Sequence, residues 1–81
     1  MPRLRRLSSR QVLRILQGFG FEVASMRGSH AKLVRMTASG ERQVLTVPVH
    51  SQMQTGTVRA IYRQASRFVP GDELRAKFFA D

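Results

Sequence analysis

The chain has 81 residues and no cysteine, which predicts one small domain and excludes disulfide bonds and thiol chemistry. Its 14 Lys and Arg residues against five Asp and Glu give a net charge of +9, which indicates a polyanionic partner such as nucleic acid or an acidic protein. No apolar run approaches the roughly 20 residues of a membrane span, and no signal-type apolar core follows the basic start, so we expect a cytoplasmic protein.

A basic arm over residues 1–7, which we expect to be loosely held, precedes the first predicted helix over residues 9–18. Ser8 and Gln11 have the spacing of a capping box, in which each side chain accepts a hydrogen bond from the other residue's backbone N–H. Apolar residues then recur at the spacing of one helical face, namely Val12, Ile15, Leu16 and Phe19. The glycines that follow are typical of a helix end.

Three extended segments follow as a predicted antiparallel meander, over residues 21–26, 30–37 and 42–49. Gly28-Ser29 breaks the first segment from the second, and Gly40 can take a positive φ in the next hairpin turn. Pro48 lacks an N–H, which places it near a strand end or on a sheet edge. The alternation of the second strand is ambiguous, so the face of the sheet that carries His30 stays open.

A polar loop over residues 50–54 leads to a second main helix that begins near Thr55. Tyr62 lies on its apolar side, and we expect it in the core rather than on a base-stacking surface. The opposite side of this helix carries an arginine every four residues, at Arg59, Arg63 and Arg67. That basic stripe is either a binding surface or an ordinary solvated helix face.

A short C-terminal helix is predicted over residues 72–79, with Asp72 as its N-cap and Leu74 and Phe78 as an apolar pair. The element order predicts an α+β fold. A three-stranded antiparallel sheet buries one face under both main helices and leaves the other face to solvent. The whole chain, 1–81, forms one predicted domain around a core over residues 8–67.

The sequence argues against several kinds of hydrolytic site. His30 and His50 lie 20 residues apart without cysteines or a local carboxylate cluster, so metal ligation is poorly supported and no cofactor is expected. Metal-free RNA cleavage needs fewer groups, because RNA carries its own nucleophile in the 2′-hydroxyl. One imidazole can accept or donate the proton near neutral pH, while Arg or Lys offsets charge on the transition state. A lone histidine near a strand end is, however, often only structural.

Four short motifs follow one another along the chain: Gly18-Phe19-Gly20-Phe21, Arg27-Gly28-Ser29-His30, Val47-Pro48-Val49-His50 and Gly56-Thr57-Val58-Arg59. In this order the sequence resembles the HicA toxins of bacterial type II toxin–antitoxin systems over roughly residues 8–67. The resemblance implies an α-β-β-β-α domain similar to double-stranded-RNA-binding domains. It also implies an endoribonuclease that cleaves mRNA independently of the ribosome and arrests growth, with a HicB-type antitoxin covering its active surface.

The resemblance assigns the catalytic role to His30, with Gly28 and Ser29 as matching neighbours that we expect to contact the RNA. We expect the positive side chains nearby to position RNA phosphates, namely Arg27, Lys32 and Arg35, and Ser29 to hydrogen-bond the substrate.

Two departures from the family pattern concern the chemistry. Many members have a second histidine where this chain has Ala31, and Thr55 stands where a proline often precedes the glycine. His50 is then either a second acid–base group or a structural residue that closes the third strand. The alternative function is a non-catalytic RNA- or DNA-binding module that uses the helix arginines on phosphates.

Overall fold

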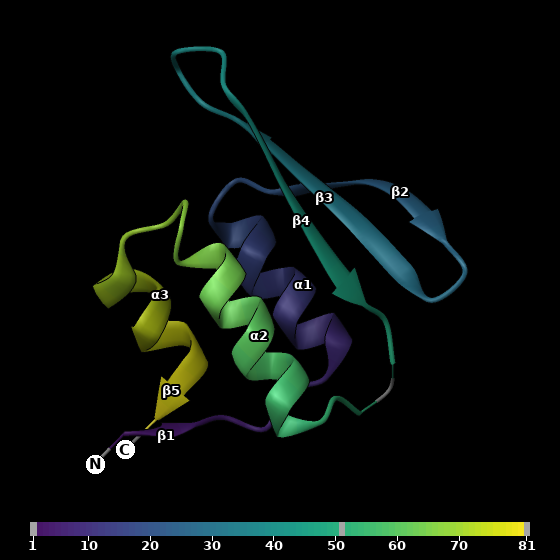
Figure 1. Cartoon of the computed structure of the whole chain (residues 1–81). Coiled ribbons are helices and arrows are strands. Elements are labelled where there is room, and N and C mark those ends of the chain that lie inside the picture. The colour runs from purple at the N-terminus through teal and green to yellow at the C-terminus, as the bar shows by residue number, and fades with distance from the viewer. Residues whose placement is uncertain (1, 51, 81) are drawn as a thin grey trace.

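The computed structural model describes residues 2–50 and 52–80. Its elements, in chain order, are β1 (Arg3–Leu4), α1 (Ser9–Gly18), β2 (Glu22–Arg27), β3 (His30–Met36), β4 (Arg42–Pro48), α2 (Thr55–Ala65), α3 (Gly71–Phe78) and β5 (Phe79–Ala80). Strands β2, β3 and β4 form an antiparallel sheet in that order, and α1, α2 and α3 gather at its lower end in Figure 1. The predicted α+β fold is confirmed. None of the helices in the described residues has the length and apolar character of a bilayer-spanning segment.

The start of α1 has the predicted capping box. The Ser8 hydroxyl accepts a hydrogen bond from the backbone N–H of Gln11, and the Gln11 side chain accepts one from the backbone N–H of Ser8. These two bonds satisfy N–H groups that the first helical turn leaves without partners. After the helix, Gly20 turns the chain into β2 with a φ of 97°, a conformation that side chains with a Cβ rarely adopt.

The sheet has one buried and one solvent-exposed face, and its register fixes which residues lie on each. Ala31 and Leu33 of β3 and their neighbours Leu45 and Val47 of β4 are buried. Their alternates in sequence point to the other face, where His30, Lys32 and Thr46 are exposed. The structure therefore answers the question that the ambiguous alternation of β3 left open, because His30 does not lie under the helices.

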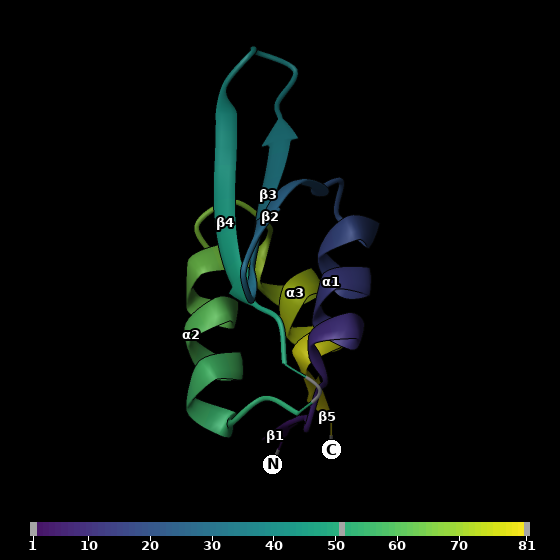
Figure 2. The same ribbon diagram turned by 90° about the vertical axis from the view of Figure 1, so that its right-hand side faces the viewer.

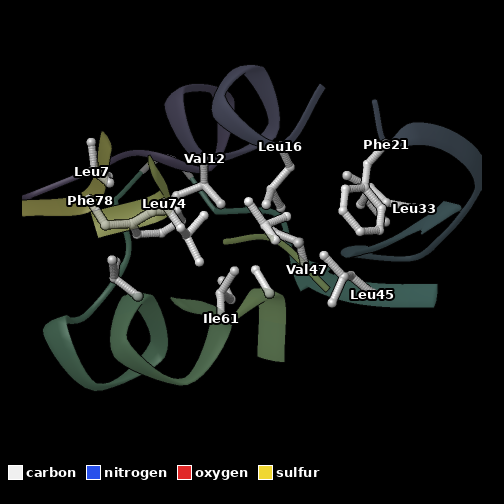
Figure 3. Close-up of a cluster of buried hydrophobic side chains, with 14 residues drawn as sticks. Leu7, Val12, Leu16, Phe21, Leu33, Leu45, Val47, Ile61, Leu74 and Phe78 are labelled. Atoms are coloured by element: carbon white, nitrogen blue, oxygen red, sulfur yellow. The ribbon is translucent and has the colours of Figure 1, made fainter. Parts of the chain in front are cut away.

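The hydrophobic core lies between the two main helices. Figure 3 shows α1 and α2 on opposite sides of the buried side chains, with β3 and β4 closing one end of the cluster. Val12 and Leu16 of α1 and Ile61 of α2 reach this cluster and are at most 2% exposed. Full burial of an aliphatic side chain stabilises the fold by about 1.5–3 kcal/mol. The apolar periodicity of both helices thus predicted the correct faces.

The N-terminal arm is docked, which corrects the expectation that it is loosely held. Arg3 and Leu4 pair with Ala80 and Phe79 in a two-stranded antiparallel sheet, and Figures 1 and 2 show both termini side by side there. The Arg5 N–H donates to the Phe78 carbonyl at 2.8 Å. The arm also contributes buried Leu7 to the core. Backbone pairing and side-chain burial together hold it.

The C-terminal helix exists as predicted, but its start differs. Pro70 occupies the N-cap position and α3 begins at Gly71, so Asp72 is not the cap. Its carboxylate lies in the first turn instead, where it still suits the positive end of the helix. On the buried side, the Phe78 ring packs against Tyr62 with a centroid distance of 5.6 Å. Tyr62 is therefore a core-packing residue, as expected.

Candidate active site

His30 is the first residue of β3 and projects from a two-residue hairpin. Arg27 of β2 is its direct partner across the ladder, which leaves Gly28 and Ser29 as the loop. Gly28 has a φ of 56°, and no residue other than glycine in the described chain has a positive φ. A positive φ at the first loop residue alone matches a type II′ turn, whose twist suits the flanking strands. Gly28 thus permits the tight turn that presents His30 to solvent.

Two exposed cations lie beside His30 on the same face of the sheet. Arg27 is directly opposite, and side chains in such pairs have Cβ atoms about 4.5–5.5 Å apart. Lys32 follows two residues along β3, so it points the same way. The sequence prediction placed both residues near the RNA, and the fold brings them together with the imidazole. An anion at His30 would lie within reach of two positive charges.

The hairpin is tied to the end of β4 and, through it, to α1. The Val49 N–H donates to the carbonyl of Ser29. The Ser9 hydroxyl bonds the Pro48 carbonyl at 3.2 Å, and it also bonds both the N–H and the carbonyl of His50. Ser9 is only 2% exposed. Sequence reasoning missed Ser9, although a second serine directly after the cap was its signal.

His50 has a structural role through its backbone. Both of its main-chain polar groups bond Ser9, whereas its imidazole is exposed. This arrangement agrees with the interpretation of His50 as a residue that closes the third strand. The groove that contains His30, described below, does not include His50 among its lining residues. The structure thus gives the two histidines different surroundings.

Arg35 does not join the His30 surface. It points to the opposite face of β3, where its guanidinium donates to Gln43 Oε1 at 2.8 Å and to the Phe19 and Phe68 carbonyls at 3.0 and 2.7 Å. The guanidinium carbon also lies 5.0 Å from the centroid of the Phe21 ring. Arg35 therefore joins β3, β4 and the segments after both main helices. We leave it out of the proposed RNA-binding set.

A groove beside His30 is a feature that the sequence did not reveal. The sheet side of the groove is formed by His30, Thr46 and Pro48. The opposite side is formed by one face of α2 together with the residue before the helix: Gln54, Gly56, Thr57, Ala60, Ile61 and Gln64. The groove is open to solvent and has a volume of about 500 Å³. Its two walls come from segments that only tertiary packing brings together. His30 is thus an exposed group at the side of a concave surface.

Further positive charge lies on α2 and just after it. Arg59, Arg63 and Arg67 are exposed on and just after α2, as the predicted stripe requires. The acidic residues that the structure describes lie elsewhere, at the start of β2, the β3–β4 hairpin and the first turn of α3. Within residues 2–50 and 52–80, no three His, Cys, Asp or Glu side chains gather as a metal-ligand cluster. The hairpin site therefore presents an imidazole beside one arginine, Arg27, and one lysine, Lys32.

Comparison with known proteins places these residues in one family. The family model described as HicA toxin of bacterial toxin-antitoxin matches residues 9–66, from the start of α1 to the end of α2. This region contains the His30 hairpin, the tether at Ser9 and both walls of the groove, whereas β1, α3 and β5 lie outside it. No curated protein matches the chain significantly. Since the match covers well over half of the 81 residues, the chain belongs to the HicA toxin family.

Proposed function

We propose that this toxin is an endoribonuclease that cleaves mRNA in the cytoplasm with His30 as its proton-transfer group. The observation that carries the proposal is the position of His30. It is an exposed imidazole on a tethered hairpin, beside Arg27 and Lys32 and at the side of a groove. Membership of a toxin family supplies the biological setting for a reaction that destroys a cellular polymer.

The chemistry assigns each group a role. The neutral imidazole of His30 accepts the proton of the RNA 2′-hydroxyl, whose oxygen attacks the adjacent phosphorus. The bond from phosphorus to the 5′-oxygen breaks, which leaves a 2′,3′-cyclic phosphate and a 5′-hydroxyl after the leaving oxygen gains a proton. Arg27 and Lys32 offset the negative charge that develops on the phosphoryl oxygens. DNA lacks the nucleophile, so this mechanism selects RNA and requires no metal ion.

The second proton transfer needs a donor to the leaving oxygen. Water supplies it in the simplest version of the mechanism, because His50 is absent from the groove lining. In this proposal Ser29, which is exposed in the hairpin loop, hydrogen-bonds the substrate near the scissile phosphate. Loss of His50 is then expected to leave cleavage largely intact, whereas loss of His30 abolishes it.

The proposed partner for neutralisation is an acidic antitoxin of the HicB type. Such a protein would compete with RNA for the same positive surface around His30. The net charge of +9 makes both encounters fast and sensitive to salt. Covering Arg27 and Lys32 would be enough to block the substrate phosphate.

The test compares purified wild type, His30→Ala and His50→Ala on one RNA substrate in EDTA, with circular dichroism as the folding control. We expect cleavage by wild type and His50→Ala and none by His30→Ala. Equal cleavage by His30→Ala would refute the assignment of His30. Loss of wild-type cleavage in EDTA would refute the metal-free mechanism. Salt-sensitive RNA binding without any cleavage would favour the non-catalytic module, whose affinity would depend on Arg59 and Arg63.

A further inference from the structure

The groove beside His30 is nearly free of charge, although the protein as a whole is strongly basic. Among the described residues that line it none is Arg, Lys, Asp or Glu, and His30 alone of these has an ionisable side chain. Phosphate channels are usually lined by basic side chains. The phosphate contacts of the site, Arg27 and Lys32, lie on the sheet outside the groove. The groove itself is therefore suited to a different part of a nucleotide.

Its lining has the composition of a surface that recognises a nucleobase. Gln54 and Gln64 carry amides that donate and accept hydrogen bonds, and Thr46 and Thr57 add hydroxyls. An amide can bond two neighbouring atoms on a base edge, which distinguishes one base from another. The accessible apolar residues in the lining, Pro48 and Ala60, offer contacts to the face of a base. Among the described lining residues none is Phe, Tyr or Trp, and the one ring system, the imidazole of His30, is assigned to the phosphate, so recognition would depend on hydrogen bonds more than on stacking.

Local geometry leaves room and free groups for such a ligand. Gly56 and Ala60 lie one helical turn apart on the groove side of α2, so no large side chain blocks the approach to that helix. Gln54 occupies the N-cap position of α2, yet its side chain makes no capping hydrogen bond. Within residues 2–50 and 52–80, the hydrogen bonds of Gln54 use only its backbone carbonyl, which accepts from the N–H groups of Thr57 and Val58. Its amide is thus available to a bound molecule.

We propose that this groove binds one unpaired nucleobase next to the phosphate at His30, and that Gln64 and Gln54 select its identity. The inference rests on the proposed function of the His30 site. It names the substrate as single-stranded RNA, because a paired base has its Watson–Crick edge occupied and cannot enter a groove in the protein. Base selection by two amides also gives the toxin a preferred cleavage position, set by α2 rather than by the hairpin.

Binding measurements test the selection separately from the chemistry. The probes are four short unpaired RNA oligonucleotides that differ in one base, with His30→Ala as the parent protein so that no probe is cleaved. We expect the parent protein to bind one of the four probes more tightly than the others. Adding Gln64→Ala should reduce this ratio of affinities about tenfold, as expected for the loss of one bidentate contact. Gln17→Ala is the control, since Gln17 is an exposed amide on α1 outside the groove. It should keep the preference.

Two results would overturn the base-selection proposal. One is equal affinity of the parent protein for all four probes. The other is an unchanged preference in both Gln64→Ala and Gln54→Ala. Cleavage mapping with the otherwise wild-type chain then links the groove to the reaction, and Gln64→Ala should shift the cut positions while His30-dependent cleavage continues. A base preference that depends on Gln64 in a protein without nuclease activity would refute the proposed function and retain the groove as a base-binding site.

Discussion

Ser9 provides the sharpest test of how the fold supports the site. Its hydroxyl bonds the Pro48 carbonyl and both backbone polar groups of His50, in a position that is only 2% exposed. Ser9→Ala removes the bonds of the hydroxyl and leaves the part-buried N–H of His50 without its acceptor, while the Ser9 N–H still donates to the His50 carbonyl. We therefore expect the free energy of unfolding to fall by about 1–3 kcal/mol. In a domain of this size, each kcal/mol shifts the melting temperature by roughly 4–8 °C.

The same substitution should also reduce RNA cleavage at temperatures where the protein stays folded. Ser9 holds the segment after β4, and Val49 in that segment bonds the Ser29 carbonyl of the hairpin that carries His30. Without this tether the hairpin is held less firmly, so we expect the His30 imidazole and the Arg27 guanidinium to be positioned less accurately around the substrate phosphate.

The neighbouring serine is a matched control for this experiment. Ser8→Ala removes the cap of α1 and lowers the free energy of unfolding by about 1 kcal/mol, but it leaves the tether to His50 intact. Urea denaturation and single-turnover cleavage of one RNA measure both quantities for both variants. If Ser9→Ala were as stable and as active as the wild type, the proposed role of Ser9 in holding the His30 hairpin would be refuted. Equal loss of cleavage in Ser8→Ala would show that the effect comes from α1 stability alone.

Three further predictions concern residues outside the tether. Arg35→Lys should lower the free energy of unfolding by about 2–3 kcal/mol in urea denaturation, because an ammonium cannot replace the planar guanidinium that bonds three acceptors. A variant as stable as the wild type would show that these bonds are not needed. Lys32→Gln in a His30→Ala background should reduce the slope of log affinity against log salt for single-stranded RNA by about 0.7, whereas Lys77→Gln on α3 should not change it. Phe78→Ala should cost about 3–5 kcal/mol, since this ring is fully buried, and loss of less than 1 kcal/mol would contradict its place in the core.

Local signals in the sequence were enough for the helices and the three-stranded sheet, and for the central motif, but not for the short strands β1 and β5. The capping box at Ser8, the helical periodicity of α1 and α2, and the glycines at positions 28 and 40 all depend on residues a few positions apart. The α+β order of elements was therefore predicted correctly, and family motifs pointed to His30. In the C-terminal helix the same kind of signal misplaced the cap by two residues, because Asp72 suits both a cap and a first turn.

Only the tertiary structure decided how these elements form a site. The alternation of β3 was ambiguous because Arg35 lies on the buried face, where distant carbonyls of Phe19 and Phe68 satisfy its guanidinium. The groove combines β4 with α2, and the docked arm pairs residues near opposite ends of the chain. Such contacts depend on the packing of segments far apart in sequence, which local patterns do not encode. The sequence by itself predicted the hairpin and proposed His30 as its functional residue, and packing determined the face, the tether and the groove beside it.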